Sequence, residues 1–200
     1  MAFERVAALI PGDKLLYPPA TQAQLDAAEE HLGQRLPADV RALYRLNDGQ
    51  VQYEPTNPRW AAGLFGGLPL LPLDQVRFYW DQWDGFEDEL DMDDEASSEP
   101  EGFVRTKYSL RGWVPLTHDG GGNHIGIDLD PDERGTIGQV ILFGRDDDWH
   151  RVLAPSLVSY LEQLGDLIEQ GHGEDGEDET GWRLLTPNGM VPHTLFRPEG

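Results

Sequence analysis

The chain has 200 residues, no cysteine and a formal charge of −22 at pH 7. The absence of cysteine excludes disulfides, thiolate metal sites and cysteine nucleophiles, and it favours a cytoplasmic location. The charge argues against direct binding to nucleic acid or an anionic membrane and favours a basic partner, because phosphate contacts need Lys and Arg.

The first quarter of the chain predicts three short helices. One helix over residues 2–10 would bury Phe3, Val6 and Ile10 on one side. Thr21-x-x-Gln24 resembles a capping box and opens a second helix, which Gly33 closes. Leu36-Pro37 opens the third helix, and Asn47-Asp48-Gly49 ends it.

The middle of the chain is rich in loops and acidic residues. Residues 50–73 carry several prolines and glycines, after which Asp74 is the predicted cap of a helix that runs to Trp83. The insert over residues 84–101 holds ten acidic residues and no basic one. Residues 103–111 show no clear period and receive no predicted element.

Residues 113–143 predict an antiparallel meander around which the chain is organised. Ile125, Ile127 and Leu129 alternate with polar or small residues, which is the period of a half-buried strand. The glycines of 119–123 supply the turn before that strand. Residues 149–153 predict the last strand, and Pro155-Ser156 opens a helix with an apolar stripe.

Three sequence patterns resemble ligand-binding sites, and we interpret each of them as residues that shape turns or strands instead. Asp128-x-Asp130-x-Asp132 lacks the glycine and glutamate that a calcium loop needs at its sixth and twelfth positions. His118 and His124 lack the ligand spacing of a zinc site. The triple glycine at 120–122 has no lysine nearby to hold phosphate. With no catalytic set visible, we expect no enzyme, no cofactor and no metal.

An aromatic cluster directly before the acidic insert suggests a partner-binding surface. In protein–protein interfaces, buried aromatic side chains supply much of the binding affinity, and charged side chains steer the partner towards the surface. The predicted partner-binding residues are Trp83, Asp84, Glu87, Asp88, Glu89, Asp91, Asp93, Asp94 and Glu95. Two alternatives stay open here: Trp80 and Trp83 could belong to the core, and the acidic run could be a solvated loop.

Five stretches in one order resemble the SUKH superfamily, in the branch named for fungal cell-wall-assembly regulators. They are LPADVRALYRLNDGQ (36–50), GGLPLLPLDQV (66–76), WVPLTHDGGGNHIGIDLDP (113–131), GTIGQV (135–140) and APSLVSYLEQL (154–164). The resemblance covers roughly residues 20–168 and implies an α+β fold, a curved antiparallel sheet with helices packed on it. We expect a single domain over residues 1–171, and an acidic extension over 172–200 that could dock back on it.

Bacterial members of this superfamily are inferred to be immunity proteins. The resemblance therefore implies a non-enzymatic protein that neutralises a cognate toxin by occlusion, and the charge suggests a basic toxin domain such as a nuclease. The alternative is an intracellular scaffold or regulatory protein-binding module like the fungal relatives.

Overall fold

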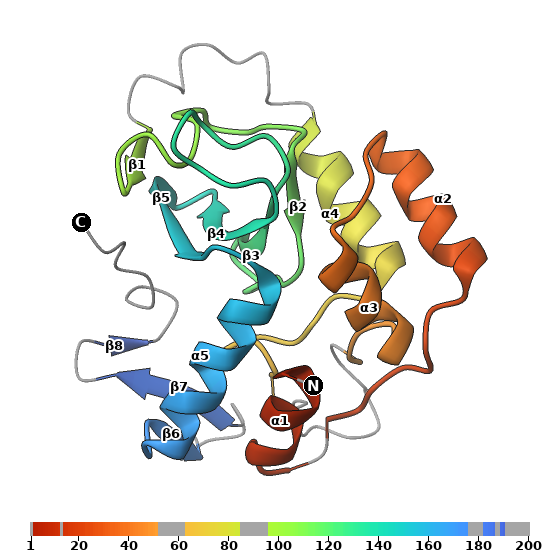
Figure 1. The fold of residues 1–200 in the computed structure, drawn as a ribbon, viewed down its shortest axis with the longest axis vertical. Coiled ribbons are helices and arrows are strands. Elements are labelled where there is room, and N and C mark those ends of the chain that lie inside the picture. The colour runs from red at the N-terminus through yellow and green to blue at the C-terminus, as the bar shows by residue number, and fades with distance from the viewer. Residues whose placement is uncertain are drawn as a thin grey trace.

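The computed structural model describes residues 2–12, 14–51, 63–84, 96–175, 182–186 and 189–190. Its principal helices are α1 (Ala2–Leu9), α2 (Gln22–Leu32), α3 (Ala38–Leu46), α4 (Leu73–Asp84) and α5 (Leu157–Glu169). In Figure 1, α2, α3 and α4 gather on one side of the central sheet, whereas α1 and α5 lie together below it. No helix within the described ranges is long and apolar enough to cross a membrane.

The central sheet has five strands in the order β1-β5-β4-β3-β2. Strands β2 (Trp113–Pro115), β3 (Asn123–Asp128), β4 (Gln139–Gly144) and β5 (Asp147–Ala154) form the predicted antiparallel meander. Strand β1 (Ser97–Glu99), from the acidic insert, pairs parallel with β5. The α+β class is therefore confirmed, and the one parallel pair makes the sheet mixed.

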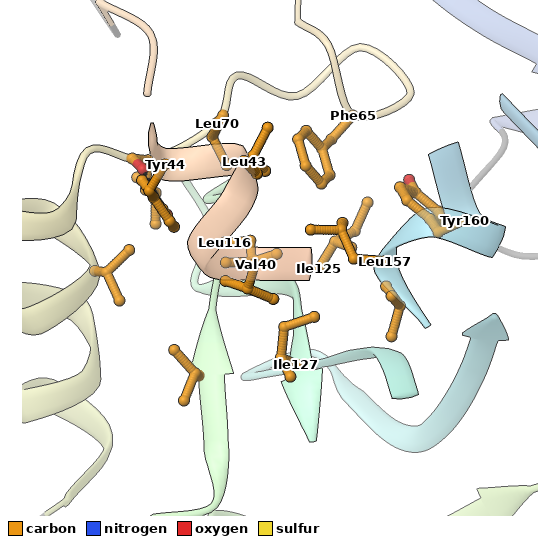
Figure 2. Packing of buried hydrophobic residues seen from close by; sticks show 14 of the residues in the cluster. Val40, Leu43, Tyr44, Phe65, Leu70, Leu116, Ile125, Ile127, Leu157 and Tyr160 are labelled. Carbon is orange, nitrogen blue, oxygen red and sulfur yellow. Dashed lines mark hydrogen bonds between the residues drawn. The ribbon is translucent and has the colours of Figure 1, made fainter. Parts of the chain in front are cut away.

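The main hydrophobic core lies between one face of the sheet and the helices. Ile125 and Ile127 of β3 belong to the same buried cluster as Val40 of α3 and Leu157 and Tyr160 of α5, and Figure 2 shows these side chains around α3. The alternation in 125–129 thus does bury its apolar residues towards the helices. This cluster supplies most of the apolar burial that stabilises the fold.

The other face of the sheet is buried as well, which the alternation did not predict. Trp113, Ile141, Phe143 and Val152 form a second cluster with Val104. Side chains of a strand alternate between its faces, so these residues point away from the main core. The segment over residues 100–112, which had no predicted element, covers this face as turns and loop. The prediction of a half-buried strand at β3 is wrong for that reason.

Two of the helix starts follow local chemistry. Thr21 and Gln24 form the capping box predicted for α2, and Ser156 caps α5 by accepting from the Ser159 amide. The predicted cap of α4 is wrong. Asp74 accepts from Gln75 N, whereas Leu73 N at the start of the helix donates to Asp48 Oδ1 at 3.0 Å. A loop residue distant in sequence therefore caps α4.

Three short strands follow α5. They are β6 (Gly173–Asp175), β7 (Trp182–Thr186) and β8 (Gly189–Met190), and they form a separate antiparallel sheet in the order β6-β7-β8. The prediction that the C-terminal extension docks back on the domain stays a prediction, as does the boundary at residue 171.

Candidate interaction surface

The glycine turn before β3 is organised by the Asp119 carboxylate. Asp119 Oδ1 accepts from the backbone N–H groups of Gly121, Gly122 and Asn123 at 2.7–3.0 Å, and Oδ2 accepts from Asn123 Nδ2 at 2.7 Å. Burial raises the pKa of Asp119, but these hydrogen bonds outweigh it and leave the pKa lowered. The turn does form the ring of amides that an anion site needs, and its own carboxylate occupies that ring.

His124 is buried in the second face of the sheet, with 1% of its surface exposed. Its Nδ1 lies 2.6 Å from the Thr117 carbonyl oxygen, which can only accept, so Nδ1 carries the proton. Its Nε2 then accepts from the Trp83 indole N–H at 2.9 Å. Burial lowers the pKa of His124 to about 4. The ring is a neutral internal link between β3 and the end of α4.

His118 is half-buried beside His124 and stacks on Tyr79, with ring centroids 4.1 Å apart. Its Nδ1 accepts from Gly120 N at 2.9 Å. His118 and His124 thus pack against aromatic side chains at the end of the glycine turn, and His124 is fully buried there. No group of three or more His, Asp or Glu side chains placed to hold a metal ion occurs within the described parts of the chain.

Asp128 is fully buried, and its contacts are those of a turn. Oδ1 accepts from Asp130 N at 3.0 Å, and Oδ2 accepts from Gln139 Nε2 at 2.9 Å. Gln139 Nε2 also donates to the Phe103 carbonyl oxygen, which joins the covering segment to the sheet. Burial raises the pKa of Asp128 to about 7. The aspartate pattern at 128–132 therefore serves turn geometry, as the sequence indicated.

Of the predicted partner-binding residues, the structure describes the first two. Trp83 is half-buried, and besides its bond to His124 its carbonyl oxygen accepts from Ser109 Oγ at 2.8 Å. Trp80 belongs to the core, with 7% exposed. Asp84 is the last residue of α4. Glu87, Asp88, Glu89, Asp91, Asp93, Asp94 and Glu95 lie outside the described residues.

A groove that the sequence did not predict runs between α2, α4 and the extended segment 14–19. It has a volume of about 930 Å³, and its lining includes Tyr17, Pro19, Gln24, Asp48, Asp74 and Arg77. We call it the α2–α4 groove; in Figure 1 these two helices lie next to each other at the edge of the molecule. Its size falls in the range of ligand-binding clefts, and its lining mixes apolar and charged groups.

Asp48 is the most constrained charged residue of the groove. Its Oδ1 accepts from Leu73 N, and its Oδ2 accepts from Gln24 Nε2 at 3.1 Å, so one carboxylate ties α2 to α4. Burial is the main reason that the pKa of Asp48 is raised, and the negative charge of Asp74 adds to it. In the sequence, Asn47-Asp48-Gly49 indicated only the end of a helix, because the contacts that build the groove are long-range.

The sequence is similar to curated fungal regulators. It is 35% identical over 179 residues to the cell wall biosynthesis/cell cycle regulator smi1 of Schizosaccharomyces pombe, covering 83% of this chain and 34% of that protein. It is 30% identical over 184 residues to the cell wall assembly regulator SMI1 of Saccharomyces cerevisiae, covering 77% of this chain and 36% of that protein. A glucan synthesis regulatory protein of Neurospora crassa is 25% identical over 205 residues, which cover 82% of this chain and 36% of that protein.

These relatives correct the functional expectation. They are named as regulators of cell wall biosynthesis, cell wall assembly and glucan synthesis, and none of these names refers to a toxin. The prediction of a toxin-neutralising immunity protein is wrong, and the alternative of a regulatory module is the better supported one. The chain spans about a third of the length of these relatives.

A family model also matches the greater part of the chain. The model of the SMI1 / KNR4 family (SUKH-1) aligns with residues 19–163, which run from the segment before α2 through the sheet and into α5. These residues contain the central sheet, the glycine turn and most of the lining of the α2–α4 groove, whereas Tyr17 and Pro18 of that lining precede the matched segment. The chain belongs to the SMI1 / KNR4 family (SUKH-1).

Proposed function

We propose that this chain is a non-enzymatic, protein-binding regulatory module, acting inside the cell as part of a larger control of cell wall synthesis. The observation that carries the proposal is the 35% identity to a named cell wall regulator over 83% of the chain. The relatives are named as regulators rather than as enzymes. A regulator of synthesis works by contacting other proteins, and the α2–α4 groove is a surface suited to such contacts.

Trp83 and the eight acidic residues from Asp84 to Glu95 are a second part of the proposed contact surface. The motivation is charge: the chain carries −22 at pH 7, and a dense acidic stretch attracts basic partners over a Debye length of about 10 Å. Both proposed parts adjoin α4, since Asp74 and Arg77 line the groove and Asp84 ends the helix.

A chimera tests the regulatory function. The matched segment of the fission yeast regulator is replaced by this chain, and the chimera is expressed in cells that lack the regulator. We expect restored growth in the presence of a cell-wall-binding dye. A chimera with Val40→Asp, which puts a charge in the main core, is the unfolded control. No rescue by a chimera that accumulates normally would contradict the proposal.

The same chimera tests the acidic stretch. Replacing the eight acidic residues by their amides should reduce rescue without lowering the amount of protein, because steering charges affect association more than folding. Unchanged rescue by the neutralised chimera would show that these residues do not contribute to the contact.

A further inference from the structure

The walls of the α2–α4 groove are held together by backbone hydrogen bonds between distant segments. Tyr17 N donates to the Gly49 carbonyl oxygen at 3.0 Å, and Asp48 N donates to that of Pro18 at 2.9 Å. Gly49 has φ +82, and a Cβ there would lie 2.4 Å from Pro72 N. The loop therefore packs directly against the start of α4. A groove fixed in this way costs little ordering when a partner binds.

The charges of the groove favour a cation. The negative charge of Asp74 disfavours ionisation of Asp48, and the positive charge of Arg77 opposes this in part. The lining thus carries one more carboxylate than guanidinium, on a chain with a charge of −22. A positive group placed between the two carboxylates would relieve their repulsion. An acidic group would meet both of them.

The apolar part of the lining suits the stem of a long basic side chain. Tyr17 is 42% exposed, and Pro18 and Pro19 follow it as exposed residues. Lys and Arg bury their methylene stems on apolar surface while the charged head stays with acidic groups, and an aromatic ring adds a cation–π attraction. In this groove, Tyr17 provides the apolar and aromatic surface for the stem, and the carboxylates of Asp48 and Asp74 provide the acidic groups for the charged head.

We propose that the α2–α4 groove binds an extended segment of a partner protein and holds one Lys or Arg side chain of that segment between Asp48 and Asp74, over Tyr17. This inference rests on the proposed function as a protein-binding module, and it names the site and the chemistry of the partner. The groove recognises a basic side chain in an extended peptide, independently of the acidic stretch beyond Asp84.

A selection from a displayed library of random linear peptides tests the groove directly. The full chain is immobilised, enriched peptides are synthesised, and their affinities are measured by fluorescence anisotropy. We expect the enriched peptides to contain Lys or Arg. Asp74→Lys and Tyr17→Ala should each weaken binding about tenfold or more, because they remove a charge partner or the apolar platform.

The matched control is Glu162→Lys, which changes the net charge as Asp74→Lys does but lies exposed on α5, outside the groove. It should weaken binding less than about twofold, as expected for a remote surface charge. Enriched peptides without Lys or Arg would overturn the proposal. Equal affinity of Asp74→Lys and wild type for the enriched peptides would overturn it as well, and Tyr17→Ala gives the same comparison if Asp74→Lys misfolds.

A cysteine-free chain allows the groove to be blocked selectively. Ala23 lines the groove and is exposed on α2, so Ala23→Cys labelled with a bulky maleimide should abolish binding of the selected peptides. Ala8→Cys, exposed on α1, is the labelled control. Undiminished binding to the labelled Ala23→Cys protein would place the peptides elsewhere and reject the groove.

The two proposals fail separately. If the chimera restores growth and the Tyr17→Ala and Asp74→Lys chimeras do so equally well, the chain is a regulatory module that does not use this groove. If the chimera does not restore growth but the selected basic peptides lose affinity on groove substitution, the groove is a peptide site in a protein with another role.

Discussion

The two ring nitrogens of His124 have opposite roles, one donating to Thr117 and the other accepting from Trp83. Burial disfavours the charged form of the ring, and protonation would also turn the acceptor nitrogen into a second donor facing the indole N–H. The pKa of His124 is lowered from 6.5 to about 4. The unfolded chain therefore takes up a proton first as the pH falls, and stability is lost between pH 6.5 and pH 4.

His124→Phe isolates this effect. At pH 7 the variant should be less stable than wild type, because it removes two hydrogen bonds. Between pH 7 and pH 5 the difference should shrink by about 2 kcal/mol, since only the wild type has to keep a buried imidazole unprotonated. Urea unfolding at both pH values measures it. A difference that is the same at pH 7 and pH 5 would contradict the internal link.

The comparison with His124→Phe is needed because Asp128 changes the stability with pH in the opposite direction to His124. Its folded pKa is raised from 3.8 to about 7, so the folded state keeps a proton that the unfolded chain releases. Its contribution to stability is greatest at low pH and is lost as the pH rises towards 7. In the wild-type protein, the effects of His124 and Asp128 on the free energy of unfolding fall in overlapping pH ranges and partly cancel each other.

Asp119→Ala should destabilise the glycine turn. The substitution leaves three backbone N–H groups without their acceptor, and we expect a loss of about 1 kcal/mol in the free energy of unfolding, because water partly replaces the carboxylate at this exposed site. Asp119→Asn keeps one acceptor oxygen and should lose less. Equal decreases of the denaturant midpoint for the two variants would argue against stabilisation of the turn by hydrogen bonds to the Asp119 carboxylate.

At the level of elements, α5 depends on its buried stripe. Leu161 is 3% exposed in the main core, so Leu161→Ala should cost about 2–5 kcal/mol in the free energy of unfolding. Val158 on the same helix is 44% exposed, and Val158→Ala should change the free energy by less than about 0.5 kcal/mol. Denaturant titrations of both variants check this. Similar losses at the two positions would mean that α5 does not pack through this stripe.

The elements that could be predicted from the sequence are those with local signals. The capping box at Thr21, the cap at Ser156 and the apolar stripes of α2 and α5 each lie within one helix. The cap of α4 and the burial of His124 depend on chain segments far away in sequence, namely Asp48 for the cap and Tyr79 and Trp83 of α4 for the histidine. The α2–α4 groove likewise has no local signature, because three separated segments build it.

The functional prediction failed for a related reason. A resemblance to the superfamily indicated the fold, but toxin neutralisers and cell wall regulators were both expected to have that fold. The net charge does not distinguish a toxin from other partners, because a charge of −22 favours any basic partner. Similarity to named regulators over 77–83% of the chain favours the regulatory alternative, which composition could not do.

At the level of the whole molecule, the net charge should make folding depend on salt. Like charges on a chain with −22 repel each other most in the compact state, and ions screen this repulsion. The melting temperature should rise when NaCl is increased from about 10 mM to about 300 mM, where the Debye length falls well below the protein diameter. Calorimetry measures it. A melting temperature that falls with salt would show that attractive ion pairs dominate instead.

The sheet with two buried faces has a consequence for how this family can diversify. Substitutions on β3 or β4 meet packed side chains on either side, so they change how much folded protein a cell contains before they change what the protein contacts. The loops and the exposed faces of the helices are less constrained, because side chains there do not pack in the core. A change of partner is therefore accommodated more readily by substitutions at these exposed positions than by substitutions in β3 or β4.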